Sequence, residues 1–230
     1  MRVLDKRVKK VLKGRPIQGF LFLAFLCGIL LTSEGRTETK PNLVILPFLV
    51  ERVQDPEKGV VCPVCKGIRR SGDILPGAQN TLTQFLYTKM EAGGTFQIIP
   101  HKKVEEILLP SERKPMGERP VSASIQMGKK LNADFVFIGN LFLFEERMGS
   151  SLGVERPAAV SFDLHLFRLR DEKMVWMGKF DETQRPLSEN LLKIGSFIRR
   201  KGSWLTAAEL ASVGMDEILG KLPGLQELDQ

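Results

Sequence analysis

The sequence predicts an α/β domain that follows an N-terminal hydrophobic segment. We expect a mixed sheet with helices packed on it, parallel in its early βαβ part and closed by a late antiparallel hairpin. The first observation is the stretch 133–146, nearly continuously apolar until Glu145 and Glu146, as in a strand buried on both faces. The second is that strand and helix patterns alternate before it, and the third is that two strand patterns joined by a turn at 170–173 follow it.

Composition and charge set the class of protein. The chain has 230 residues, of which 43% are hydrophobic and 27% charged, enough for one sizeable core. Its net charge is +7, but residues 1–35 hold seven of the 34 Lys and Arg and two of the 27 Asp and Glu. The remainder, with 27 basic and 25 acidic residues, is close to neutral. We therefore expect no nucleic-acid partner.

Residues 1–35 have the pattern of a signal peptide or a single membrane anchor. A basic run ends at Arg15, and the apolar run 17–31 that follows is short for a spanning helix. The basic side stays in the cytoplasm, so we expect the body in the periplasm, or on the outer face of the cytoplasmic membrane, of a Gram-negative-type cell. An uncut leader would hold the protein at the membrane. Lipid attachment at Cys27 is not expected, because Leu26 precedes it and the apolar run continues.

The remaining chain divides into a linker at 36–41, a single α/β domain at 42–222 and a tail at 223–230. Within the first half, prolines and glycines mark where elements begin and end. The predicted elements are strand 42–48, a long cysteine-bearing loop at 49–77, helix 78–90, strand 95–99, a short helix from Pro100, a loop at 110–120 and a helix from Pro120 into the central strand.

The second half begins with a pattern of strict alternation. Its apolar residues Val160, Phe162, Leu164 and Leu166 alternate with the polar residues Ser161, Asp163 and His165. This predicts a half-buried strand and a solvated or hydrogen-bonded His165. The next strand, 174–181, would turn Trp176 toward the core. Two helices close the chain, the first from Ser188 to near Gly202 and the second behind the capping box of Thr206 and Glu209.

Several of these segments together resemble a known group of envelope domains. The matching segments are the strand and loop from Leu43 to Phe48, Phe96–Pro100 with its helix, Gly128–Gly139 with the alanine-aspartate-strand-glycine pattern, and the strand pair of Phe162–Leu164 and Val175–Trp176. The group comprises the amino-terminal domain of TolB, the curli secretion lipoprotein (CsgG) and the LpoB-like activators of peptidoglycan synthases. The resemblance covers roughly residues 43–180.

The resemblance implies a non-catalytic exported protein that acts as a protein-interaction or assembly domain. It implies another envelope protein as partner and allows a homo-oligomer. Two departures concern cysteines. The chain has no lipoprotein attachment motif, and the loop with Cys62 and Cys65 belongs to none of these families.

Cys62-Pro63-Val64-Cys65 is the sharpest motif of the sequence. Haem attachment is excluded, because Lys66 rather than histidine follows the second cysteine. A structural disulfide is the preferred interpretation, because export exposes the pair to oxidants. The motif also fits a zinc site of four ligands, completed by His101 and His165 or, as the preferred form, by the CxxC pair of a second chain. A redox dithiol is the remaining alternative, although the glycines and proline that follow prevent an immediate helix.

No residue is predicted to be catalytic. The sequence has no nucleophile elbow, phosphate-binding loop or paired His-Glu motif. We therefore do not expect an enzyme, and zinc is the one cofactor that we consider. The alternative function is a periplasmic thiol-redox or metal-binding protein that uses Cys62 and Cys65.

Overall fold

A computed structural model describes residues 39–51, 59–108, 116–150, 153–184 and 204–230. Residues Lys40–Gln230 form one compact unit. The predicted leader with Cys27 and the predicted helix at 188–202 lie outside the described residues. Among the helices that are described, none combines the length and the hydropathy needed to cross a bilayer.

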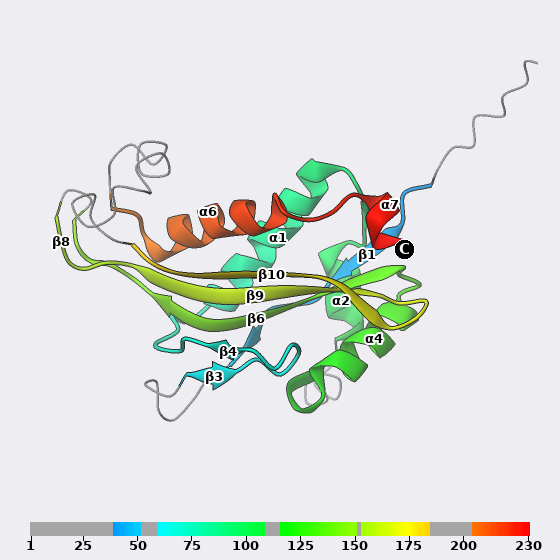
Figure 1. Cartoon of the computed structure of the whole chain (residues 1–230), viewed down its shortest axis with the longest axis horizontal. Helices are drawn as coiled ribbons and strands as arrows, with labels where there is room; N and C mark the ends of the chain where they lie inside the picture. The colour runs from blue at the N-terminus through cyan, green and yellow to red at the C-terminus, as the bar shows by residue number, and fades with distance from the viewer. Residues whose placement is uncertain (1–38, 52–58, 109–115, 151–152, 185–203) are drawn as a thin grey trace, which may run out of the picture. The chain divides into compact units, whose positions relative to one another are not determined.

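Six of the described strands build one mixed sheet, shown in Figure 1. Its order is β10 (Lys173–Thr183), β9 (Ala159–Arg168), β6 (Phe135–Glu145), β1 (Asn42–Ile45) and β5 (Gln97–Ile98), and β2 (Leu49–Val50) also pairs with β6. The strand β1 runs parallel to β5 and β6, whereas β9 is antiparallel to β6 and β10. This confirms the predicted fold class.

The central strand β6 organises the sheet. All ten residues from Phe135 to Phe144 are buried, which confirms the prediction for this stretch. Along one flank β6 pairs first with β1, then with β2, and finally with Ile74 through a parallel bridge at Phe144. Gly139 leaves room for the ring of Phe48, because a Cβ at this position would lie 2.7 Å from two ring carbons.

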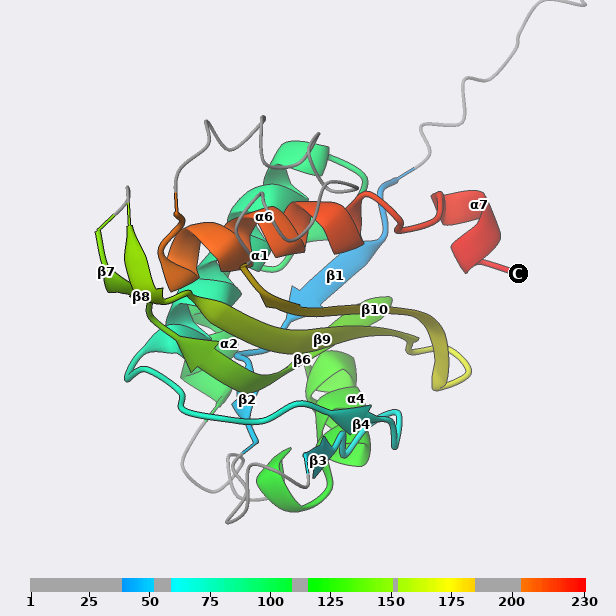
Figure 2. The ribbon, with the colours of Figure 1, turned by 60° about the vertical axis from the view of Figure 1, so that its left-hand side comes forward.

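Helices cover both faces of the sheet, as Figure 2 shows. On one face lie α1 (Ala78–Gly93) and α6 (Ala207–Leu219), which share a core with the inward residues of β1, β6 and β9. On the other face α2 (His101–Ile107) and α4 (Pro120–Lys130) close a second core. The two cores follow from the strand alternation, because Leu43 and Phe137 face one side and Val44 and Val136 face the other.

The aspartate of the predicted Ala-Asp pattern fixes the point where the chain enters the sheet. The backbone N–H of Asn42 donates to the Asp134 carboxylate at 2.7 Å. In return, the backbone N–H of Asp134 donates to the Asn42 carbonyl at 2.8 Å. Asp134 thereby joins the first residue of β1 to the residue that precedes β6.

Two predictions need correction or extension. The strand β9 is buried along its entire length rather than half-buried, because a second layer covers its polar side. That layer comes from the predicted loop 49–77, which contains the hairpin of β3 (Val60–Val61) and β4 (Ile68–Arg69). Another short hairpin, β7 (Met148–Gly149) and β8 (Val154–Arg156), lies between β6 and β9 in the sequence. Near the C-terminus, the short helix α7 (Leu225–Leu228) buries Leu228.

Candidate metal centre

The hairpin β3–β4 presents its two cysteines through a tight turn. The backbone N–H of Cys62 donates to the Gly67 carbonyl at 2.8 Å, and the N–H of Lys66 donates back to the Cys62 carbonyl at 3.0 Å. Lys66 takes a positive φ of 63° at this reversal. Inside the turn, the backbone N–H groups of Val64 and Cys65 both point at the Cys62 sulfur, each at 3.4 Å. The turn therefore surrounds one sulfur with two donors.

The strand β9 supplies the opposite side of the site. Asp163 and His165 are two residues apart, so their side chains leave the same face of the sheet. Both are fully buried, because the hairpin lies over them. The prediction that His165 lies on a half-buried strand was therefore wrong. Its strand is buried along its length, and the turn that holds Cys62 and Cys65 covers the His165 side chain.

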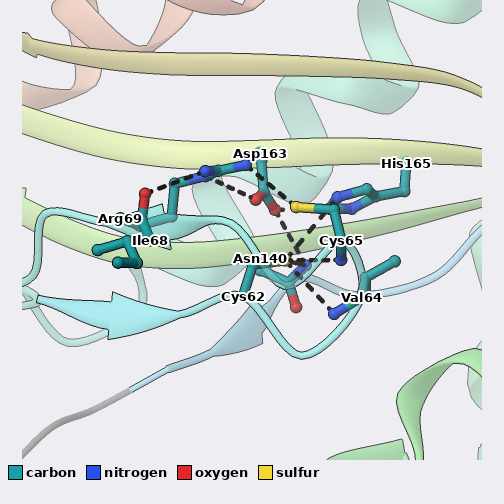
Figure 3. A network of polar contacts seen from close by, with 8 residues as sticks. All are labelled: Cys62, Val64, Cys65, Ile68, Arg69, Asn140, Asp163 and His165. Atoms are coloured by element: carbon teal, nitrogen blue, oxygen red, sulfur yellow. Dashed lines mark hydrogen bonds and ion pairs between the residues drawn. The ribbon is translucent and has the colours of Figure 1, made fainter.

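The four side chains converge on one point, as Figure 3 shows. Ligand atoms of Cys62, Cys65, Asp163 and His165 all lie within 4.8 Å of one another. The Cys62 Sγ and the His165 Nε2 are 3.8 Å apart. One chain thus brings together two thiols, an imidazole and a carboxylate. His101, the other histidine considered as a zinc ligand, lies instead on α2 beside Glu105 and Tyr87.

Two further side chains surround this set. The Arg69 guanidinium donates from Nε to the Asp163 carboxylate at 3.0 Å and from Nη2 to the Cys65 sulfur at 3.1 Å. The Asn140 amide nitrogen lies 3.0 Å from the other Asp163 oxygen and 3.7 Å from the Cys62 sulfur. Both residues are buried. Neither was predicted from the sequence, since a single arginine or asparagine carries no spacing signal.

Several buried polar atoms in this region have no hydrogen-bond partner among the described residues. They are the Asn140 Oδ1, the Ser161 Oγ and the His165 Nδ1. Buried polar atoms are ordinarily paired with protein or ordered water, and an unpaired one costs about 1–3 kcal/mol. The three atoms lie on the adjoining strands β6 and β9, and the His165 Nδ1 is 3.6 Å from the Asp163 Oδ1, beyond the length of a hydrogen bond.

Burial sets the protonation of the two best-placed ligands. It raises the pKa of the Cys62 thiol to about 12, with a further increase from the charge of Asp163 and an opposing effect from the N–H groups of Cys65 and Val64. Burial also lowers the pKa of His165. The free site thus holds a neutral thiol and a neutral imidazole at pH 7. A metal ion changes this, because a coordinating thiol loses its proton.

The chemistry of the turn separates the alternatives for Cys62 and Cys65. Both are free thiols in the structure, and a disulfide between them stays a prediction for the oxidised protein. A redox dithiol needs a cysteine whose pKa is lowered, whereas the pKa of Cys62 is raised. Thiolate, imidazole and carboxylate, the three kinds of donor present here, are also the kinds that bind zinc.

Comparisons with known proteins give similarities of fold alone. No family model matches the chain, and no curated protein matches it. A PelC dodecamer structure from Paraburkholderia phytofirmans is 12% identical with a TM-score of 0.45, over 81% of this chain and 89% of that one. Lipoprotein GNA1162 from Neisseria meningitidis is 13% identical with a TM-score of 0.42, over 70% and 95% of the two chains.

The LpoB C-terminal domain from Salmonella enterica is 13% identical with a TM-score of 0.37, over 64% of this chain and 84% of that one. LpoB thus represents, among these structures, one of the families that the sequence resembles. The resemblance to TolB and to the curli secretion lipoprotein stays a prediction. At such identities these similarities assign no function to the chain.

Proposed function

We propose that the protein is a non-catalytic, exported envelope protein whose β3–β4 hairpin is fixed to the sheet by one bound zinc ion. The observation that carries the metal site is the convergence of ligand atoms from Cys62, Cys65, Asp163 and His165 within 4.8 Å of one another. The export rests on the basic and apolar pattern of residues 1–35.

The geometry fits zinc. With Zn–S about 2.3 Å, Zn–N about 2.0–2.1 Å and tetrahedral angles, a sulfur and a nitrogen ligand lie about 3.6 Å apart. The observed distance from the Cys62 Sγ to the His165 Nε2 is 3.8 Å. The set offers four protein ligands, which is typical of structural rather than catalytic zinc. The metal would therefore stabilise structure and leave no position for a substrate.

The hairpin itself supplies the physical reason for a metal. Its two strands have two residues each, and a hairpin of this size is at best marginally stable in water. Its apolar side chains Val61 and Ile68 are 56% and 74% exposed, so they contribute little hydrophobic stabilisation. Beneath the hairpin the sheet presents Asn140, Asp163 and His165 instead of apolar groups. A metal ion would add a second strong interaction to the Arg69–Asp163 ion pair that joins the hairpin to the sheet.

Metal analysis of the freshly purified protein, kept reduced, tests the proposal. We expect one zinc per chain, and none in the Cys62→Ser/Cys65→Ser double variant. A chelator should greatly increase hydrogen exchange at the Cys62 and Lys66 amides, while the Val136 amide in β6 stays protected. A reduced protein that neither contains zinc nor takes it up would refute the metal site. Rapid alkylation of Cys62 at neutral pH would favour the thiol-redox alternative.

The resemblance to envelope domains supports a second part of the proposal, a protein partner in the envelope. The cross-strand pair of Val61 and Ile68 is the exposed apolar surface that a bound metal would hold in place. A photo-crosslinker placed at Ile68 in cells should therefore give one defined protein adduct that disappears in the double cysteine variant. A crosslinker at Lys102, on α2, serves as the control. Absence of an adduct at Ile68, or one that persists without the cysteines, would remove the hairpin from the interaction.

A further inference from the structure

We propose that Arg69 is the positioning residue of this metal centre. It orients two of the four ligands and neutralises the one negative charge of the ligands that a divalent ion does not cancel. The inference rests on the proposed zinc site and adds a residue that touches the ligands rather than the ion. Figure 3 shows its guanidinium beside Asp163 and the Cys65 sulfur.

The contacts of Arg69 are directed. Its Nε holds the Asp163 Oδ2 at 3.0 Å, its Nη2 holds the Cys65 sulfur at 3.1 Å, and its Nη1 donates to the Ile68 carbonyl at 3.1 Å. One planar group thus connects a ligand on β9 to a ligand on the hairpin. Since the Asp163 side chain is fully buried and that of Arg69 is 8% exposed, water screens this ion pair little. A group that hydrogen-bonds to the ligands of a metal, without touching the metal itself, holds those ligands in orientation.

The charges of the site require a further cation beside a divalent metal. Two thiolates and the Asp163 carboxylate bring three negative charges, and the imidazole is neutral. A divalent ion cancels two of them, and the Arg69 guanidinium, which stays protonated, cancels the third. The four ligands, a divalent ion and Arg69 are together neutral, which reduces the cost of burying these charges, and the pKa of the neighbouring Glu51 is raised by burial and by the charge of Asp163.

Gly67 provides independent support for the placement of Arg69. A Cβ on this residue would lie 2.5 Å from the Arg69 Nη1, closer than atoms can approach. The guanidinium therefore occupies space that exists because residue 67 has no side chain. Gly67→Ala should displace the guanidinium without altering any metal ligand.

Zinc titration of reduced, metal-free full-length variants tests the inference. Arg69→Gln should weaken zinc binding about 10–100-fold, as the loss of a group that hydrogen-bonds to a metal ligand typically does. Arg69→Lys should bind zinc more tightly than Arg69→Gln but less tightly than the parent. Lysine returns the positive charge but has no planar group that donates to both Asp163 and Cys65. Gly67→Ala should weaken binding in the same direction. The matched controls are Arg70→Gln, which removes an exposed arginine that binds Asp181, and Gly153→Ala, where a Cβ meets open space. Both controls should bind zinc as the parent does.

The visible spectrum of the cobalt(II)-substituted protein separates positioning from simple stability. Its ligand-field bands report the kind and number of ligands, so Arg69→Gln should change them while Arg70→Gln leaves them unchanged. Equal zinc affinity and an unchanged cobalt spectrum in Arg69→Gln would refute the role of Arg69 while leaving the metal site intact. If the parent protein binds no metal, the proposed function fails first, and the variants are not needed to decide it.

Discussion

Cys62 is subject to opposing influences at the scale of a single sulfur atom. Two backbone N–H groups point at it and favour the thiolate, whereas burial and the nearby Asp163 carboxylate favour the thiol. Burial has the larger effect, so the pKa of the thiol is raised. The same two donors stabilise the sulfur once a cation has replaced its proton. The turn thus suits a metal ligand better than it suits a nucleophile.

The two histidines make a matched pair for testing the ligand set. We expect His165→Gln to weaken zinc binding more than Arg69→Gln does, that is by more than about 10–100-fold. The reason is that it removes a ligand from a buried site. His101→Gln should leave binding unchanged, since His101 is partly exposed beside Glu105 on α2. Competition of each variant with a chromogenic chelator measures both affinities. Equal affinities would exclude His165 as a ligand.

Phe137 tests the central strand at the same scale. Its side chain is fully buried in the core beneath α1 and α6, where its ring meets that of Trp176 edge-on at 6.1 Å. Phe137→Ala should therefore lower the free energy of unfolding by about 3–5 kcal/mol. Met174→Ala, at a side chain 44% exposed, is the control and should change it little. Denaturant unfolding measures both, and a loss below about 1 kcal/mol for Phe137→Ala would contradict the burial of β6.

At the scale of elements, the sequence predicts β6 well and the metal centre poorly. A continuous apolar run has few interpretations, and β6 is buried as predicted. In β9, by contrast, alternation shows that Ser161, Asp163 and His165 share a face, but it does not distinguish a face in water from one beneath a polar hairpin. Cys62 and His165 are 103 positions apart, so only the fold brings them together.

The start of α6 gives a prediction that depends on pH. The Thr206 backbone N–H and hydroxyl both donate to the Glu209 carboxylate, at 2.8 and 3.0 Å, and the Glu209 N–H donates to the hydroxyl at 3.2 Å. These bonds from Thr206 lower the pKa of Glu209. Their contribution to stability is therefore present above the ordinary pKa of glutamate, about 4.3, and is lost as the pH falls through the lowered value.

Thr206→Ala should cost about 1 kcal/mol at pH 7, as the loss of an N-cap typically does. Part of this cost should disappear in acid, where the parent loses the bond from its hydroxyl to the charged carboxylate but keeps the bond from the Glu209 N–H to the hydroxyl. Thermal unfolding of both proteins across this pH range checks the difference. A cost that stays constant into strong acid would mean that the box contributes independently of the Glu209 charge.

At the scale of the whole molecule, the two faces of the sheet have different composition. The face under α1 and α6 is apolar throughout its core. The other face is apolar under α2 and α4 and polar under the cysteine hairpin. Chelation of the metal should therefore loosen one hairpin and leave both cores folded, which a hydrogen-exchange map of the domain would show as local rather than global opening.

Export concerns the chain as a whole. Because basic residues precede the apolar run 17–31, the body should lie outside the cytoplasmic membrane. A reporter that is active only in the cytoplasm, fused after Gln230, should give no signal. The same fusion without residues 1–35 should be active. Activity of the full-length fusion would contradict export.

The position of β1 determines how the domain responds to a mechanical load. β1 begins at Asn42 and lies between β5 and β6, parallel to both, with Asp134 clamped to its first residue. If the leader stays in the membrane while a partner holds the body, tension enters along β1. Its hydrogen bonds to both neighbours then bear the force together, in shear, instead of opening one after another. In a protein tethered in this way, the hydrogen bonds of β1 to β5 and β6 would together oppose the removal of β1 from the sheet.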